Sequence, residues 1–244
     1  MREAIARNFS EHYDVTVDPE TQVTVCCGAT EAMMSTMLAI VDPGDEVVVF
    51  EPFYENYGPD AILSGAVPRY VTLREPEWSF DEEELAAAFS NRTKAIIINS
   101  PNNPTGKVFS RDELTVIAKL CQQWGVLAVT DEIYEHIIYD NFNFFTMAQI
   151  KELKDRTLTM NGVSKSYAMT GWRIGYGAGP KEIIKAMAKI QSQSTTNPSS
   201  ISQAAAVEAL NGTQNFIIER SKAFQGRRDF VVKSLNEIKG LNCL

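Results

Sequence analysis

The chain has 244 residues, of which 44% are hydrophobic, so it is long enough to bury a large core in one or two domains. Its 23 lysines and arginines against 31 aspartates and glutamates give a formal net charge of −8, without blocks of like charge. That balance excludes nucleic acid and acidic membranes as main partners.

Short runs rich in β-branched residues predict strands, and longer amphipathic segments between and after them predict helices. The predicted strands are Val23–Cys26, Glu46–Phe50, Ala95–Asn99, Val126–Thr130 and Thr157–Met160. The predicted helices are Ala32–Ile40, Asp81–Phe89, Ser110–Trp124, Lys181–Gln191, Ile201–Leu210 and Gln214–Lys239. This alternation predicts an α/β fold with a mostly parallel central sheet, built from right-handed βαβ units and flanked by helices on both faces.

The four cysteines, Cys26, Cys27, Cys121 and Cys243, form no CxxC pair, and a bridge between the adjacent Cys26 and Cys27 would be strained. This usage fits a reducing compartment. No apolar run approaches the roughly 20 residues that cross a bilayer, and the first residues lack the apolar core of a signal peptide. We therefore expect a soluble, cytoplasmic protein.

Reactive side chains follow each predicted strand. Ligands of open α/β sheets bind beyond the carboxyl ends of the strands, so we expect these side chains to share one crevice. They lie in the segments Gly28–Glu31, Pro52–Tyr54, Ser100–Lys107, Asp131–Tyr134 and Asn161–Lys165. Together they offer a helix start, an aromatic face, an amide, a carboxylate, a phenol and an amine.

That set of groups suits pyridoxal 5'-phosphate (PLP). The carbonyl of PLP requires a lysine, its pyridine nitrogen a carboxylate, and its phosphate an arginine and helix-end N–H donors. The phenolic oxygen requires hydrogen-bond donors, and the ring requires a stacking partner.

Four segments carry a resemblance to class I/II aminotransferases of PLP fold type I, the group of aspartate, kynurenine and glutamine-phenylpyruvate transaminases. They are GATEA at 28–32, SPNNPTGKVFS at 100–110, DEIYEH at 131–136 and NGVSKSYAMTGWRIGY at 161–176. Their order and spacing also match, and the last segment, with Arg173 following Lys165, is highly specific. The resemblance covers essentially the whole chain and implies the large, cofactor-binding domain of that fold.

The resemblance implies the roles of the groups that hold the cofactor. Lys165 is the catalytic residue and carries PLP as an aldimine, while Asp131 keeps the pyridine nitrogen protonated. Arg173 grips the phosphate, which also receives backbone contacts from Ala29 and Thr30.

The remaining implied contacts surround the cofactor ring. Tyr54 stacks on the ring, and Asn103 and Tyr134 contact its phenolic oxygen. Each such residue also has a purely structural interpretation: Tyr54 as core packing, Asn103 as a turn residue before proline, and Asp131 as the cap of a following helix.

Three departures from the family pattern concern the phosphate and the ends of the chain. Many relatives have a serine where this chain has Gly162, so Ser164 or Ser166 is expected to substitute. The arm that relatives lend to the neighbouring subunit would lie before Met1, and the small domain that binds the substrate carboxylate would lie after Leu244. Residues 1–244 are thus expected to be the PLP-binding large domain, with about 214–244 a long helix leading towards an absent small domain.

The implied function is transfer of an amino group between an amino acid and a 2-oxo acid, by a protein expected to be a homodimer. A PLP-dependent C–S β-lyase would use the same cofactor residues, and a truncated, non-catalytic cofactor-binding remnant is the alternative outside enzymes. Lys107, His12 and His136 are interpreted as structural, and no metal site is expected. The glycines of 175–179 follow a GxGxG pattern without the spacing of a dinucleotide loop.

Overall fold

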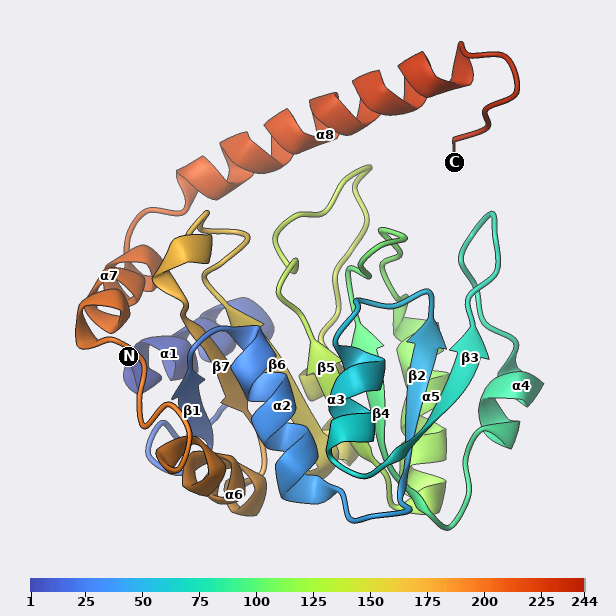
Figure 1. The fold of residues 1–244 in the computed structure, drawn as a ribbon. Coiled ribbons are helices and arrows are strands. Elements are labelled where there is room, and N and C mark those ends of the chain that lie inside the picture. The colour runs from blue at the N-terminus through green and yellow to red at the C-terminus, as the bar shows by residue number, and fades with distance from the viewer. Residues whose placement is uncertain (244) are drawn as a thin grey trace.

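The computed structural model describes residues 1–243, whose strands form one seven-stranded sheet (Figure 1). The strands are β1 (Val23–Cys26), β2 (Glu46–Glu51), β3 (Val67–Thr72), β4 (Thr93–Asn99), β5 (Leu127–Asp131), β6 (Thr157–Gly162) and β7 (Gly175–Ala178). Their order is β1-β7-β6-β5-β4-β2-β3. β7 is antiparallel to both of its neighbours, and the other neighbouring pairs are parallel. The predicted α/β fold with a mostly parallel sheet is confirmed.

Helices cover both faces of the sheet (Figure 1). They are α1 (Arg2–Tyr13), α2 (Ala29–Ile40), α3 (Tyr57–Leu63), α4 (Glu82–Ala87), α5 (Arg111–Trp124), α6 (Lys181–Ser192), α7 (Ser200–Asn211) and α8 (Asn215–Asn236). Short 3-10 segments occur at η1 (Met147–Gln149), η2 (Lys151–Arg156) and η3 (Thr170–Trp172). The six predicted helices are present, with ends shifted by a few residues, and α5 begins with a capping box formed by Ser110 and Glu113.

Two strands and two helices escaped prediction. The strand β3 is an edge strand that contains Pro68 and exposes most of its side chains, and β7 contains Gly175 and Gly177. Proline and glycine are depleted in strands, so neither segment reads as one. In α3 the Gly58-Pro59 pair resembles a turn, yet a proline in the first turn of a helix replaces an N–H that needs no partner.

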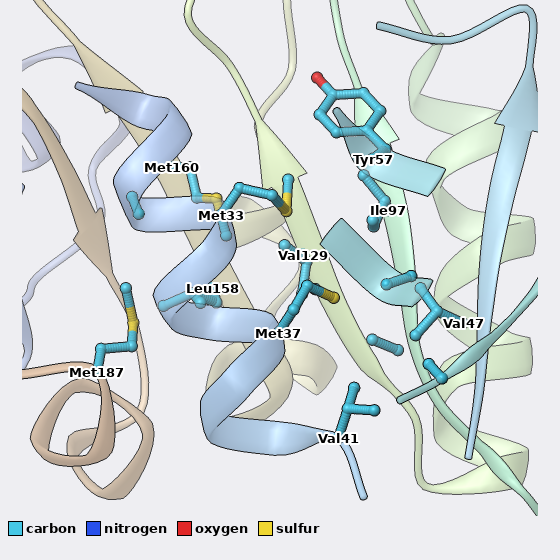
Figure 2. Close-up of a cluster of buried hydrophobic side chains, with 14 of the residues drawn as sticks. Met33, Met37, Val41, Val47, Tyr57, Ile97, Val129, Leu158, Met160 and Met187 are labelled. Atoms are coloured by element: carbon cyan, nitrogen blue, oxygen red, sulfur yellow. The ribbon is translucent and has the colours of Figure 1, made fainter. Parts of the chain in front are cut away.

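The core consists of two layers, one on each face of the sheet. Figure 2 shows Met33 and Met37 of α2 packed against residues of β4, β5 and β6, among them Ile97 and Val129. Neighbouring strand residues such as Ile96 point the other way, into the layer formed with α5. Because both faces are covered, the central strands are continuously buried instead of alternating.

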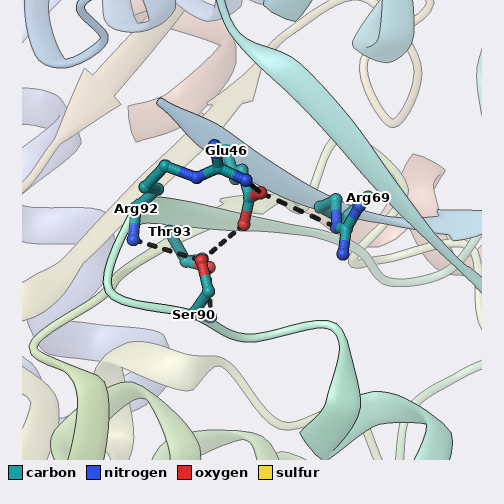
Figure 3. A network of polar contacts seen from close by, with 5 residues as sticks. All are labelled: Glu46, Arg69, Ser90, Arg92 and Thr93. Atoms are coloured by element: carbon teal, nitrogen blue, oxygen red, sulfur yellow. Dashed lines mark hydrogen bonds and ion pairs between the residues drawn. The ribbon is translucent and has the colours of Figure 1, made fainter. Parts of the chain in front are cut away.

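A buried carboxylate fastens the amino ends of three strands. Glu46, at the start of β2, is 1% exposed and accepts hydrogen bonds from Ser90 at 2.6 Å and Arg92 at 2.5 Å (Figure 3). Arg69 of β3 lies 3.9 Å from the same carboxylate. The hydrogen bond from Ser90 and the charge of Arg92 lower the pKa of Glu46, while burial opposes them. The network joins β2, β3 and the segment before β4, at the edge opposite the carboxyl ends.

Helix α8 lies along the side of the molecule towards which the parallel strands point (Figure 1). At its start, Phe216 and Ile217 pack into an apolar cluster with Tyr167. Further along, its contacts include polar ones: Ser221 donates to the Ile138 carbonyl at 3.3 Å, and Arg228 pairs with Asp140 at 2.8 Å. Among the helices within residues 1–243, none is both long and apolar enough to cross a membrane.

Candidate active site

A cavity of about 220 Å³ opens beyond the carboxyl ends of the parallel strands. The carboxyl ends of β4 and β5, the segments that follow β1, β2, β4, β5 and β6, and η3 with the residue after it line this cavity. Every predicted site residue contributes to its wall: Ala29, Thr30, Tyr54, Asn103, Asp131, Tyr134, Ser164, Lys165 and Arg173. Two larger hollows, of about 440 and 920 Å³, lie elsewhere on the described residues and include none of them. We therefore locate the candidate site in the smaller cavity, where the predicted site residues gather.

One end of the cavity is suited to an anion. Helix α2 starts here, and within residues 1–243 no side chain caps its first turn, so the N–H groups of Ala29 and Thr30 stay available. Gly28, the residue before the helix, has φ 88°, and a Cβ on it would lie 2.3 Å from Nη2 of Arg173. The absent side chain at Gly28 thus leaves room for the guanidinium beside the helix start. Arg173 is held by a 2.8 Å bond from Nη1 to the Thr170 carbonyl.

The same packing explains the departure at Gly162. A Cβ at Gly162 would lie 2.7 Å from the Ile174 carbonyl oxygen and 2.9 Å from Cα of Gly175. A serine has no space there because β6 and β7 approach too closely. Ser164 lines the cavity, whereas the buried Ser166 does not. Of the two expected substitutes, Ser164 is the one at the site.

Asp131 ends β5 and carries a buried carboxylate in the wall of the cavity. Its Oδ2 accepts a hydrogen bond from the Tyr57 hydroxyl at 2.7 Å, and its Oδ1 accepts one from the Ile133 N–H at 3.2 Å. Burial raises the pKa of Asp131, and the hydrogen bonds and the charge of Lys165 oppose that rise. The segment after β5 forms turns, so the interpretation of Asp131 as a helix cap is wrong.

An amide and a phenol, Asn103 and Tyr134, also line the wall. The Asn103 N–H donates to Oδ1 of Asn99 at 2.7 Å, and the Asn99 amide donates to the Asp131 carbonyl at 2.9 Å. This chain of bonds ties the loop after β4 to the end of β5. Burial and the Asp131 charge raise the pKa of Tyr134, which contact with the Asn103 side chain lowers.

The amine and the aromatic face complete the cavity. The exposed Lys165 follows β6, and its Nζ lies 5.6 Å from the ring centroid of Tyr134. Tyr54, in the loop after β2, meets Tyr57 edge to face with centroids 5.8 Å apart. Tyr54 lies at the cavity wall and also packs against the core, and its stacking on a cofactor ring stays a prediction.

Five further residues line the cavity without having been predicted: Asn56, Tyr57, Asn99, Ile133 and Thr170. Tyr57 is the most informative of them because its hydroxyl bonds directly to Asp131. The available signal was a second tyrosine close to Tyr54, in the same segment that follows β2. Lys107, interpreted as structural, forms an ion pair with Glu113 at 2.7 Å and does not line the cavity.

The family model for aminotransferases of class I and II matches residues 1–244. This chain belongs to that family. The aspartate/prephenate aminotransferase of Cereibacter sphaeroides is 46% identical to this class I and II aminotransferase, over 100% of the chain and 61% of the relative. The crystal structure of the aspartate aminotransferase from Rhizobium meliloti superposes with a TM-score of 0.95 at 43% identity, covering 100% of this chain and 61% of that one.

The aromatic aminotransferase from Pyrococcus horikoshii OT3 is similar at a TM-score of 0.93 and 37% identity, over 97% of this chain and 64% of that one. The chain thus spans less than two thirds of the length of the curated relatives cited above. Likeness at this level in sequence and structure shows the PLP-dependent aminotransferase fold.

Pyridoxal 5'-phosphate is the cofactor of this family, and the donor groups of the cavity fit it. The open helix start and Arg173 are complementary to a phosphate dianion, and Asp131 supplies a buried carboxylate for a protonated ring nitrogen. Lys165 supplies the amine and Tyr54 an aromatic face. Each chemical part of the cofactor has a matching group in one cavity.

Proposed function

We propose that this protein transfers an amino group between an amino acid and a 2-oxo acid through PLP attached to Lys165. The observation that carries the proposal is the convergence of an amine, a buried carboxylate and a guanidinium on one cavity. They come from three separate places in the chain: the segment after β6, the end of β5 and the residue after η3. Membership in the class I and II aminotransferases supports it.

When bound, PLP provides an electron sink for the bond that breaks at the substrate's α-carbon. In the proposed mechanism Asp131 maintains a negative charge beside the ring nitrogen, and burial strengthens that interaction. Lys165 Nζ, once free, would take the proton from the substrate's α-carbon and deliver it to the carbon of the cofactor that receives the amino group. Because Lys165 follows the buried strand β6, its backbone is anchored while its amine reaches into the open cavity.

The other site residues orient the cofactor in this proposal. Arg173 and the N–H groups of Ala29 and Thr30 hold the phosphate, with Ser164 beside them. Tyr54 stacks on the ring, while Asn103 and Tyr134 donate hydrogen bonds to its phenolic oxygen. These contacts suppress rotation of the ring, so the α-carbon stays aligned with Lys165 Nζ.

The named relatives guide the choice of substrate. Cereibacter and Rhizobium relatives are named for aspartate, and the Pyrococcus structure for aromatic amino acids. We propose aspartate as the first amino donor to test, with 2-oxoglutarate as acceptor. Because these relatives are aminotransferases, they favour transamination over the β-elimination of a C–S lyase and over a remnant without turnover.

Two further properties belong to the same proposal. A homodimer is supported by exposed apolar side chains on α7 and α8, such as Ile201 at 74% and Phe230 at 70% exposure. A cytoplasmic location is supported by the four cysteines, all within the described residues and all free thiols. In addition, we propose that α8 leads towards a second, smaller domain.

Chemical trapping tests the proposed role of Lys165. Borohydride treatment of the PLP-loaded protein should leave a pyridoxyl mass on the peptide that contains Lys165, because reduction makes the bond between Lys165 Nζ and the cofactor irreversible. Lys165→Ala should lose both the label and turnover with aspartate and 2-oxoglutarate. Peptide mapping by mass spectrometry and a coupled transaminase assay measure these two results.

An exposed lysine on α8 provides the matched control. Lys222→Ala removes a lysine far along the chain from the cavity and should keep the label on Lys165. A pyridoxyl group found on another lysine, or a Lys165→Ala variant that still turns over, would overturn the proposal.

A further inference from the structure

Tyr57 occupies an unusual place between the core and the cavity. It is the first residue of α3, is 2% exposed, and belongs to the apolar cluster beneath α2 (Figure 2). Its ring is held by apolar packing, whereas its hydroxyl points away from that packing to the Asp131 carboxylate at 2.7 Å. The ring thus determines where the hydroxyl lies.

The Asp131 carboxylate needs such a donor because it is removed from water. Burial favours the protonated acid, and a hydrogen bond donated to an oxygen of the ionised form favours the carboxylate. The pKa of Tyr57 is raised well above its ordinary value by burial and by the Asp131 charge, so the phenol keeps its proton and remains a donor. The bond therefore has one direction, from Tyr57 to Asp131.

The other groups that face Asp131 act differently. The Ile133 N–H donates to Oδ1 at 3.2 Å, and Lys165 contributes a positive charge from across the cavity. Tyr134 and Tyr54 lie near the same pair. When a cofactor takes up the Lys165 amine, that charge is no longer a free ammonium. The Tyr57 hydroxyl then remains as the side-chain donor to Asp131.

We propose that Tyr57 is a positioning residue whose hydroxyl keeps Asp131 in its carboxylate form and in one orientation, ready to receive a protonated ring nitrogen. This inference rests on the proposed function for its purpose, but the bond itself can be tested without cofactor. Tyr57 takes no direct part in the chemistry, because it acts through Asp131.

The first test follows the carboxylate directly. Carbon-detected NMR of the cofactor-free protein, with the Asp131 signal identified by its loss in Asp131→Asn, gives the pH midpoint of that group. Tyr57→Phe should lower the acid dissociation constant of Asp131 roughly tenfold, the scale of one hydrogen bond to a charged group. The midpoint should accordingly move to higher pH.

A matched control is Tyr167→Phe. Tyr167 is also buried, at 8% exposure, and no described residue gives its hydroxyl a hydrogen bond. Deleting that hydroxyl should leave the Asp131 midpoint unchanged. An equal midpoint in wild type and Tyr57→Phe overturns the inference, as does a shift of equal size in Tyr167→Phe.

PLP titration then links the bond to the site. Tyr57→Phe should lose cofactor affinity at mildly acidic pH where wild type still binds, by roughly tenfold. In an Asp131→Asn background the same substitution should have no further effect, because the group through which it acts is gone. A full additional loss there would mean that Tyr57 contributes independently of Asp131, and would overturn the inference.

The outcomes separate the two claims. Wild type that fails to bind PLP contradicts the proposed function, while the NMR midpoints still decide the role of Tyr57. If Tyr57→Phe does not fold, the hydroxyl proton of Tyr57 in the intact protein replaces it as the probe. That proton should resonate far downfield in wild type and move upfield in Asp131→Asn, where the acceptor is neutral; an unmoved resonance overturns the inference.

Discussion

Asp60 shows what a buried carboxylate costs when it has no partner. Its side chain is 6% exposed, and no described residue gives its Oδ2 a hydrogen bond. Asn56 and Ser64 cap the two ends of α3, each about one helical turn from Asp60. Both carry buried oxygens that likewise receive no hydrogen bond from a described residue. Burial raises the pKa of Asp60 from 3.8 to about 6. Asp131, by contrast, has two hydrogen-bond donors. A buried carboxylate with donors is stabilised by its surroundings, whereas the one at Asp60 destabilises the fold.

The raised pKa of Asp60 makes stability depend on pH. Between about pH 4 and pH 6 the folded state holds a proton that the unfolded chain releases, so the free energy of unfolding falls as pH rises through this window. Asp60→Asn should remove the penalty and stabilise the protein by about 1–3 kcal/mol at pH 7. At pH 4 the gain should vanish. Urea unfolding of both proteins at the two pH values measures the difference, and an equal gain at both would contradict the assignment.

At the scale of elements, the contact between β7 and the start of α2 shapes the phosphate end of the cavity. A Cβ on Gly175 would lie 2.3 Å from the Ala29 nitrogen and 2.3 Å from the Gly28 carbonyl carbon. Backbone atoms cannot move aside as the end of a flexible side chain can. The glycine is therefore required for strand and helix to approach, and the cavity inherits its geometry from that approach.

Gly175→Ala should consequently reduce both stability and phosphate binding. We expect the free energy of unfolding to fall by about 3 kcal/mol, the upper range for an extra methyl group in a packed core, because α2 must shift. The control is Gly226→Ala in α8, where no atom of the described residues lies within 4 Å of the new Cβ. That variant should gain about 0.5–1 kcal/mol from helix propensity. Denaturant unfolding and PLP titration measure both; a neutral Gly175→Ala would show that α2 is not held by this contact.

For the whole molecule, the composition of the cavity limits what residues 1–244 can bind by themselves. Arg173 is the one arginine among the described residues that line the cavity, and it lies at the phosphate end beside Gly28. A substrate α-carboxylate would need a second guanidinium for a bidentate contact. Recognition of the substrate thus calls for a group from outside this cavity wall.

The polypeptide 1–244, expressed alone, should therefore bind its amino acid substrate weakly. Lacking one bidentate contact, worth about 2–4 kcal/mol, it should show an affinity roughly 30- to 1000-fold below that of a full-length relative. Water in the open cavity should weaken the remaining charge interactions further. A steady-state assay with aspartate and 2-oxoglutarate tests this, and turnover of about 1–100 per second would contradict it.

Local physics made much of this predictable from the residues. The central strands appear as continuous apolar runs because both faces of the sheet are covered. The capping box of Ser110 marks the start of α5. Because parallel strands end at one edge, reactive residues after each strand predicted a shared cavity. All nine predicted site residues line it, although their individual roles remain predictions.

Long-range packing determined the rest. The segment of β7 has poor strand propensity, and becomes a strand because its glycines fit against α2 and α6. Tyr57 and Asp131 are 74 residues apart, and neither local propensity nor spacing indicates that one donates to the other. Such contacts arise only when the sheet forms and brings α3 over the end of β5. Side-chain identity specifies which groups are available for chemistry, but the packing of distant elements decides which of them meet.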